Sequence, residues 1–296
     1  MTRKSPKDSA WRNKVFNFFH LLWRAIKKFD DDHGFFLSSG ITFSLLICLI
    51  PLILLLLALL GTYLYSALDV VSQIRLYLGS VVPSSDPRVM KNILRIIRDR
   101  KIVGILGLGG LLWTSTWVFS SLRTALDVVF QVEKGRGILR GKTVDLLMIF
   151  LAGLFLLASM TLSSVMVHLQ SFRFGGPLAI KPIFQFFLKY VAPFLFTFWM
   201  FFLIYKIVPD RKIHFGVAFQ AACFTSVLWE LARQIFGWYT SHLGSFSMVY
   251  GSLSTLAAFF LWIYYSSAIL ILGGEVAFLL QAGRKESNNQ RKRQDR

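Results

Sequence analysis

Cysteine is almost absent from this chain. Its 296 residues include two cysteines, Cys48 and Cys223, and neither belongs to a Cys-x-x-Cys pair or a Cys/His cluster. They therefore carry no signal for a metal site and no information about redox compartment. Because both lie within apolar stretches, we expect them to act as small buried hydrophobic side chains.

The sequence also lacks the motifs of hydrolases and nucleotide-dependent enzymes. Its five histidines are scattered, without His-x-His or His-Glu-x-x-His spacing; they are His20, His33, His168, His214 and His242. No Walker A sequence and no Gly-x-Ser-x-Gly turn occurs. We therefore expect no catalytic residues, no metal site, no cofactor and no ATPase, and we interpret the chain as a protein that is not an enzyme.

Long apolar runs, by contrast, fill most of the chain. Each run exceeds the roughly 20 residues that a helix needs to cross a hydrocarbon core of about 30 Å. The six runs cover about residues 36–65, 102–130, 143–170, 183–208, 215–240 and 253–282. This pattern predicts an all-α fold, namely a polytopic transmembrane helical bundle of six spans, with a single membrane domain over residues 36–282.

Acidic residues are scarce: 33 Lys and Arg stand against 15 Asp and Glu, a formal charge of +18. If both termini are cytosolic, the segments on that side hold 21 Lys and Arg and the opposite side holds nine. This asymmetry follows the positive-inside rule, by which the cytosolic loops of membrane proteins carry an excess of Lys and Arg. We therefore expect the charge to orient the chain and to contact phospholipid headgroups, anionic ones included, and we expect no nucleic-acid partner.

Two segments outside the spans have amphipathic patterns. Residues 1–35 form a basic cytosolic arm, in which 11–29 predicts a helix lying in the membrane interface, with His20, Arg24, Lys27 and Lys28 on its polar face. The segment 66–101 predicts a second such helix on the outer surface, beginning near Pro87. The tail 283–296 is basic and lacks hydrophobic residues, so we predict that it is disordered.

Ionisable residues inside the spans are costly and mark candidate functional positions. Near the inner side, an Arg123, Asp127 and Glu275 cluster is feasible because the three share a depth. Toward the outer side a second set is found: His168, Lys189, Glu230 and Arg233. These clusters either form a polar path for a substrate or protons, or tie helices together.

Two prolines and one loop are further candidates for shaping such a path. Pro51 and Pro193 lie within predicted spans and can kink their helices. The uncharged stretch 244–255 either lines a cavity as irregular backbone or is an ordinary loop. Its residues of interest are Gly244, Tyr250, Gly251 and Ser252.

Several short motifs, in this order and spacing, resemble the YihY/BrkB family of bacterial inner-membrane proteins. They are GITFSLL at 40–46, IPL at 50–52, LWTST at 112–116, LRTAL at 122–126, PDRK at 209–212, WELAR at 229–233, YGSL at 250–253, LWIYY at 261–265 and LGGE at 272–275. The resemblance covers about residues 35–282. It implies a six-span protein of the cell inner membrane, for which no active-site residues are agreed. The older ribonuclease BN label of that family is regarded as mistaken.

The leading functional hypothesis is a transporter or lipid-handling protein of the envelope without an ATPase of its own. The alternative is a non-transporting scaffold for envelope integrity, in which the charged clusters are structural. An RNA-processing enzyme is disfavoured because the catalytic motifs are missing. A hydrated cavity reaching Asp127 or Glu230 distinguishes the first two hypotheses. The sequence specifies no oligomeric state.

Overall fold

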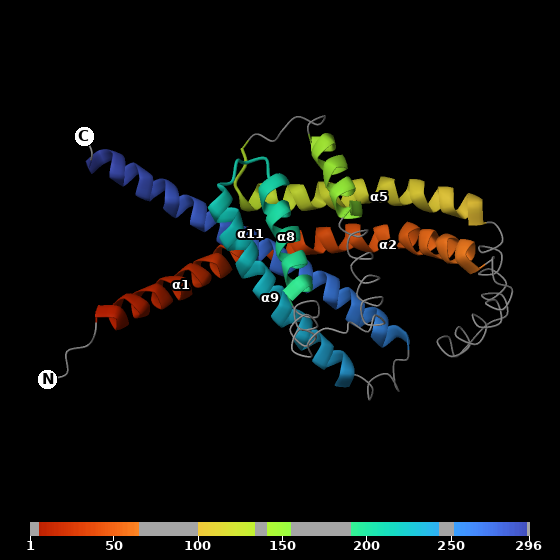
Figure 1. Cartoon of the computed structure of the whole chain (residues 1–296), viewed down its shortest axis with the longest axis horizontal. Coiled ribbons are helices and arrows are strands. Elements are labelled where there is room, and N and C mark those ends of the chain that lie inside the picture. The colour runs from red at the N-terminus through yellow and green to blue at the C-terminus, as the bar shows by residue number, and fades with distance from the viewer. Residues whose placement is uncertain (1–5, 65–99, 134–140, 155–190, 243–251, 295–296) are drawn as a thin grey trace, which may run out of the picture. The chain divides into compact units, whose positions relative to one another are not determined.

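The computed structural model describes residues 6–64, 100–133, 141–154, 191–242 and 252–294 (Figure 1). Within these ranges the chain forms seven helices and no strand, so the prediction of an all-α protein is confirmed. Six of the helices are α1 (Pro6–Asp31), α2 (Gly34–Leu64), α5 (Arg100–Val129), α8 (Ala192–Ile207), α9 (Phe215–His242) and α11 (Ser252–Gln294). The seventh covers the described residues 141–154.

Four of these helices contain stretches long and apolar enough to cross a membrane. The stretches are Gly34–Leu59, Lys101–Val129, Phe215–Thr240 and Leu256–Gln294, and they coincide with four of the predicted spans. The helix α8 is a shorter apolar helix inside the predicted span 183–208, and 141–154 covers the start of the predicted span 143–170. The chain therefore has several membrane-crossing helices, whereas the count of six stays a prediction.

The chain divides into two compact units, one made of residues 1–42 and 119–296 and the other of residues 43–118. In the second unit, α2 and α5 pack closely through the small residues of α5. A Cβ atom on Gly107 would lie 2.9 Å from the backbone nitrogen of Leu55, and one on Gly110 would lie 3.1 Å from the Pro51 ring. The glycine-rich start of the second span thus allows close helix approach, as small residues do between membrane helices.

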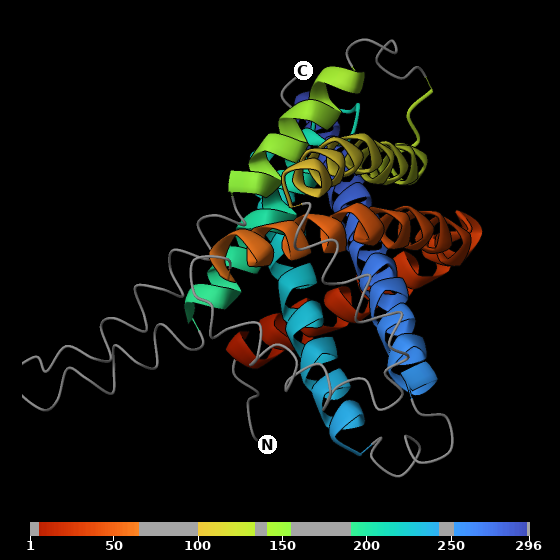
Figure 2. The same cartoon turned by 90° about the vertical axis from the view of Figure 1, so that its right-hand side faces the viewer.

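In the first unit, α9 packs against both α8 and α11, and α1 packs against α11. The helices α9 and α11 run side by side in opposite directions (Figure 2). Three helices meet at Tyr205, whose hydroxyl lies 2.9 Å from Thr225 Oγ1 and donates to the Leu270 carbonyl at 2.8 Å. Because these polar groups are buried and mutually hydrogen-bonded, they fix the three helices against one another.

The end of α1 explains how the first helix turns into the second. His33 has a φ of 55°, a left-handed conformation that ends a helix, and α2 begins at the next residue. Gly34 lies directly against the Phe29 ring, which leaves no room for a Cβ atom. The interfacial helix predicted at 11–29 is thus present as a helix, and Phe19 and Trp23 are exposed on it.

Three details of the prediction differ from the structure. Cys223, expected to be a buried side chain, is exposed on α9, and Cys48 is half-buried. The tail was predicted to be disordered, but α11 continues as a helix to Gln294. Pro193 was expected in mid-helix and instead lies in the first turn of α8, where its missing N–H is tolerated. Pro51 does lie inside α2, which is helical on both sides of it. Most of the outer segment 66–101 lies outside the described residues.

Candidate functional site

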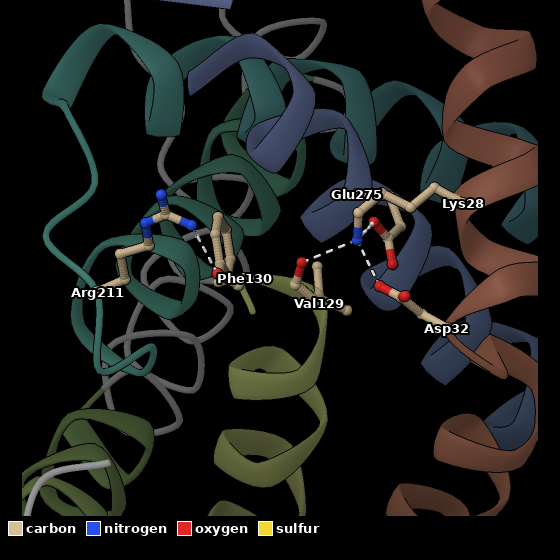
Figure 3. A network of polar contacts seen from close by, with 6 residues as sticks. All are labelled: Lys28, Asp32, Val129, Phe130, Arg211 and Glu275. Atoms are coloured by element: carbon tan, nitrogen blue, oxygen red, sulfur yellow. Dashed lines mark hydrogen bonds and ion pairs between the residues drawn. The ribbon is translucent and has the colours of Figure 1, made fainter. Parts of the chain in front are cut away.

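Lys28, in the last turn of α1, is the centre of a polar network (Figure 3). Its Nζ atom donates to Glu275 Oε2 at 2.7 Å and to the Val129 carbonyl at 3.0 Å, and it also pairs with Asp32 one helical turn away. The site therefore joins residues from the start, the middle and the end of the sequence. Local sequence patterns cannot show such a meeting, because Lys28 and Glu275 are 247 positions apart.

Glu275 is completely buried in α11. One carboxylate oxygen is bonded to Lys28, while the other, Oε1, has no hydrogen-bond partner among the described residues. Burying a charge is unfavourable unless it is paired, so Lys28 is the group that permits a carboxylate here. With Asp32 included, one cation serves two carboxylates.

The second feature of the site is the C-terminal end of α5, whose last carbonyls have no partner within the helix. Lys28 donates to the Val129 carbonyl, and Arg211 donates to the Phe130 carbonyl at 2.7 Å. Both cations also lie over the Phe278 ring, at 4.3 and 5.6 Å from its centroid. Positive charge at a helix C-terminus is stabilising, so this end is held from two sides.

The connection between α8 and α9 is fixed to the same region. Asp127 Oδ1 accepts a hydrogen bond from the backbone N–H of Asp210 at 2.8 Å. Gln281 of α11 donates to the Lys212 carbonyl at 2.8 Å and accepts from the backbone N–H of His214 at 3.1 Å. These contacts hold a short loop in a defined position beside α5 and α11.

A polar pocket of about 910 Å³ opens next to this network. Asp127, Asp210 and Arg211 line it, and Phe278 forms part of its wall. Phe278 is also the ring under Lys28, so the pocket borders the buried ion pair. Among the described residues, no group of three or more His, Cys, Asp or Glu side chains is placed to hold a metal ion.

The three residues of the predicted inner cluster, Arg123, Asp127 and Glu275, have different partners in the structure. Glu275 pairs with Lys28, and Arg123 pairs with Asp145 at 3.3 Å. Asp127 lies at the pocket, bonded to the α8–α9 connection. The prediction that ionisable groups gather at this end of the spans thus found Glu275 and Asp127, but it assigned Glu275 to the wrong cation.

The outer cluster is described only in part. Glu230 and Arg233 form an ion pair at 2.6 Å within α9, with Arg233 exposed. His168 and Lys189 lie outside the described residues, as do Gly244, Tyr250 and Gly251. Ser252 is the first residue of α11.

Three residues of the site were missed by the sequence reasoning: Lys28, Asp145 and Arg211. Lys28 was assigned to the solvated face of the first helix, although it faces Glu275. Asp145 carried a usable signal, since it is an acidic residue within a predicted span, and it is 4% exposed. Arg211 belongs to the PDRK motif, which was used only as a family signature.

Comparison with known proteins places the chain in a family. A family model described as "Virulence factor BrkB" matches residues 25–296. A UPF0761 membrane protein of Glaesserella parasuis is 30% identical over 67% of this chain and 69% of its own length. One from Chlorobium phaeobacteroides, a longer protein, is 28% identical over 93% of this chain and 59% of its own length. One from Pseudoalteromonas translucida is 26% identical over 85% of this chain and 82% of its own length.

No solved structure matches the chain. The family model extends over most of the chain, and the relatives are named as membrane proteins, in agreement with the apolar helices. The chain is therefore an integral membrane protein that belongs to the BrkB family.

Proposed function

We propose that this protein is a multi-pass protein of the bacterial inner membrane, with both termini cytosolic, that transports or handles a lipid or another envelope component. It does so without an ATPase and without catalysing a chemical reaction. The proposal rests on how a polar pocket, a buried ion pair and apolar membrane-crossing helices are combined at one end of the first unit.

The observation that carries the proposal is the pocket of about 910 Å³ that reaches Asp127. A protein that only ties helices together needs its polar groups paired but needs no space beside them. Here Asp127 and Arg211 line an opening, and the Lys28–Glu275 pair lies behind the wall made by Phe278. Ionisable groups that border an open pocket at the end of apolar helices are typical of substrate and proton paths.

The scaffold alternative is favoured by a different observation. Lys28 of α1 bonds to both α5 and α11, so the network also acts as a clamp between three helices. A useful experiment must therefore remove charge at the pocket without removing a contact that holds the fold.

Asp127→Asn is the mildest change of this kind. The asparagine keeps an oxygen that accepts the Asp210 N–H, but it removes one negative charge from the pocket. We expect a normal protein level together with loss of function. The measurement is complementation of the envelope phenotype of a strain that lacks the gene, with protein level determined in the same membranes.

Glu286→Gln is the matched control, because it removes one negative charge from an exposed position on α11 outside the pocket residues. It should complement fully. If Asp127→Asn also complements fully at a normal level, the pocket has no part in transport and the scaffold function is favoured.

Orientation is tested separately. The proposed cytosolic segments hold 21 Lys and Arg and the proposed external segments hold nine, which predicts that reporters fused after residues 100, 177 and 248 are external. Alkaline phosphatase fused at these positions should be active and green fluorescent protein should not fluoresce. A cytosolic result at residue 100 contradicts the proposed orientation.

A further inference from the structure

We infer that a second, basic pocket between the start of α9 and the C-terminal part of α11 binds the phosphate group of an anionic phospholipid. This pocket is separate from the one at Asp127. The inference concerns a binding site, so it holds whether or not the protein transports its ligand.

The pocket has a volume of about 280 Å³, room for a phosphate group with part of its headgroup. Four basic side chains and two amides line it: Lys212, His214, Gln281, Arg284, Lys285 and Asn288. Lysine, arginine and side-chain amides are donors, and phosphate oxygens are acceptors. No acidic residue lines the pocket.

The frame of this pocket is held in place before any ligand arrives. Gln281 is buried, and its amide bonds both to the Lys212 carbonyl and to the His214 N–H. Arg284 lies beside the first turn of α9, where a Cβ atom on Gly216 would be 3.5 Å from its Nη1 atom. That turn is also the positive end of the α9 dipole, which favours an anion.

The cations of the pocket have no acidic partner among the described residues. Within the part of the chain that the structure describes, none of Lys212, Arg284 and Lys285 takes part in an ion pair. Holding like charges around one small space is unfavourable without a counter-ion. An anion that contacts all three relieves this repulsion, whereas three cations spread over a surface share no common ligand.

The position of the pocket along the helices indicates a lipid as the source of the phosphate. The spanning helix α9 begins at Phe215, directly after His214, and Phe215 and Phe219 are both exposed. On the other wall, α11 is apolar up to Leu280 and becomes basic from Arg284. Cations above exposed apolar side chains fit a molecule with a charged headgroup and acyl chains, and this boundary is where phospholipid headgroups lie.

The test uses the full chain in neutral detergent at about 0.15 M salt, where remote surface charges are largely screened. Native mass spectrometry measures binding of dioleoyl phosphatidylglycerol, with dioleoyl phosphatidylcholine as the zwitterionic comparison. The pocket variant carries Lys212→Gln, Arg284→Gln and Lys285→Gln. The control variant removes three exposed cations that do not line the pocket, by Arg24→Gln, Lys27→Gln and Lys292→Gln.

We expect the pocket variant to bind phosphatidylglycerol about 100-fold more weakly, since each Lys or Arg near an anionic lipid contributes a factor of about five. The control variant should bind within about threefold of the unmodified protein. Arg284→Gln alone should weaken binding about fivefold. Because Arg284 is exposed, the melting temperature of this single variant should stay unchanged, which would show that its fold is intact.

Equal weakening in both triple variants overturns the inference, because it shows that only total charge matters. A parallel titration with inorganic phosphate identifies the source of the anion. If phosphate shifts the melting temperature of the unmodified protein but not of the pocket variant, while phosphatidylglycerol binds both equally, the lipid assignment is wrong.

Discussion

Replacing Lys28 by methionine is expected to lower the free energy of unfolding by about 3–5 kcal/mol, because it leaves a buried carboxylate without its cation. Glu275 is fully buried, and its Oε1 atom already lacks a partner among the described residues. Once Lys28 is removed, Oε2 loses its bond as well. The measurement is denaturant unfolding in mixed micelles, together with the amount of protein in the membrane.

The partner variants make this prediction specific. Glu275→Gln should cost less, because Lys28 still pairs with Asp32 and still donates to the Val129 carbonyl. The double variant Lys28→Met with Glu275→Met should recover most of the lost stability, since an apolar pair of similar volume can replace a buried ion pair. If Lys28→Met is no more harmful than Glu275→Gln, the burial of Glu275 does not depend on Lys28.

Gly273→Ala is expected to cause the other large loss of stability, about 3–5 kcal/mol from overpacking and broken hydrogen bonds. A Cβ atom at this position would overlap both the Thr225 hydroxyl and the Tyr205 hydroxyl. Tyr205 is fully buried and holds α8, α9 and α11 together, so it has no space into which to move. The unfolding measurement is the same as for Lys28.

Gly283→Ala is the matched control on the same helix. Nothing lies within 4 Å of a Cβ atom there, so the change should be neutral or stabilising by up to about 1 kcal/mol, as alanine favours a helix over glycine. Equal stability of the two variants would show that α8, α9 and α11 are not packed as closely as the structure indicates.

The helices could be predicted from the sequence because their signal is local. Runs such as 36–65 and 102–130 identify membrane-crossing helices by composition and length alone. The glycines around Gly107 are likewise a local signal of close helix approach, since a Cβ atom on Gly107 would lie only 2.9 Å from the backbone nitrogen of Leu55. The continuation of α11 beyond residue 282 could not be predicted from composition, because a polar, basic segment without hydrophobic residues is typical of disorder when it is considered by itself.

The partners in the site could not be predicted, because they depend on how distant helices meet. Glu275 and Asp127 were found as ionisable residues in apolar surroundings, which is a property of each position. That Glu275 meets Lys28 depends on the packing of α1 against α11. The amphipathic pattern placed Lys28 on a solvated face, and its long side chain reaches the network from that edge.

We propose that the polar network and its pocket serve the function of the protein and do not merely hold its helices together. The most direct measurement is complementation of the envelope phenotype of a strain that lacks the gene by the Lys28→Met, Glu275→Met double variant, at a membrane level equal to that of the unmodified protein. This variant removes the buried charges, and its free energy of unfolding, measured in the same preparation, must be close to that of the unmodified protein, as expected when an apolar pair replaces a buried ion pair. We expect a stable protein that fails to complement, whereas full complementation at that level would contradict a functional role for the network and its pocket.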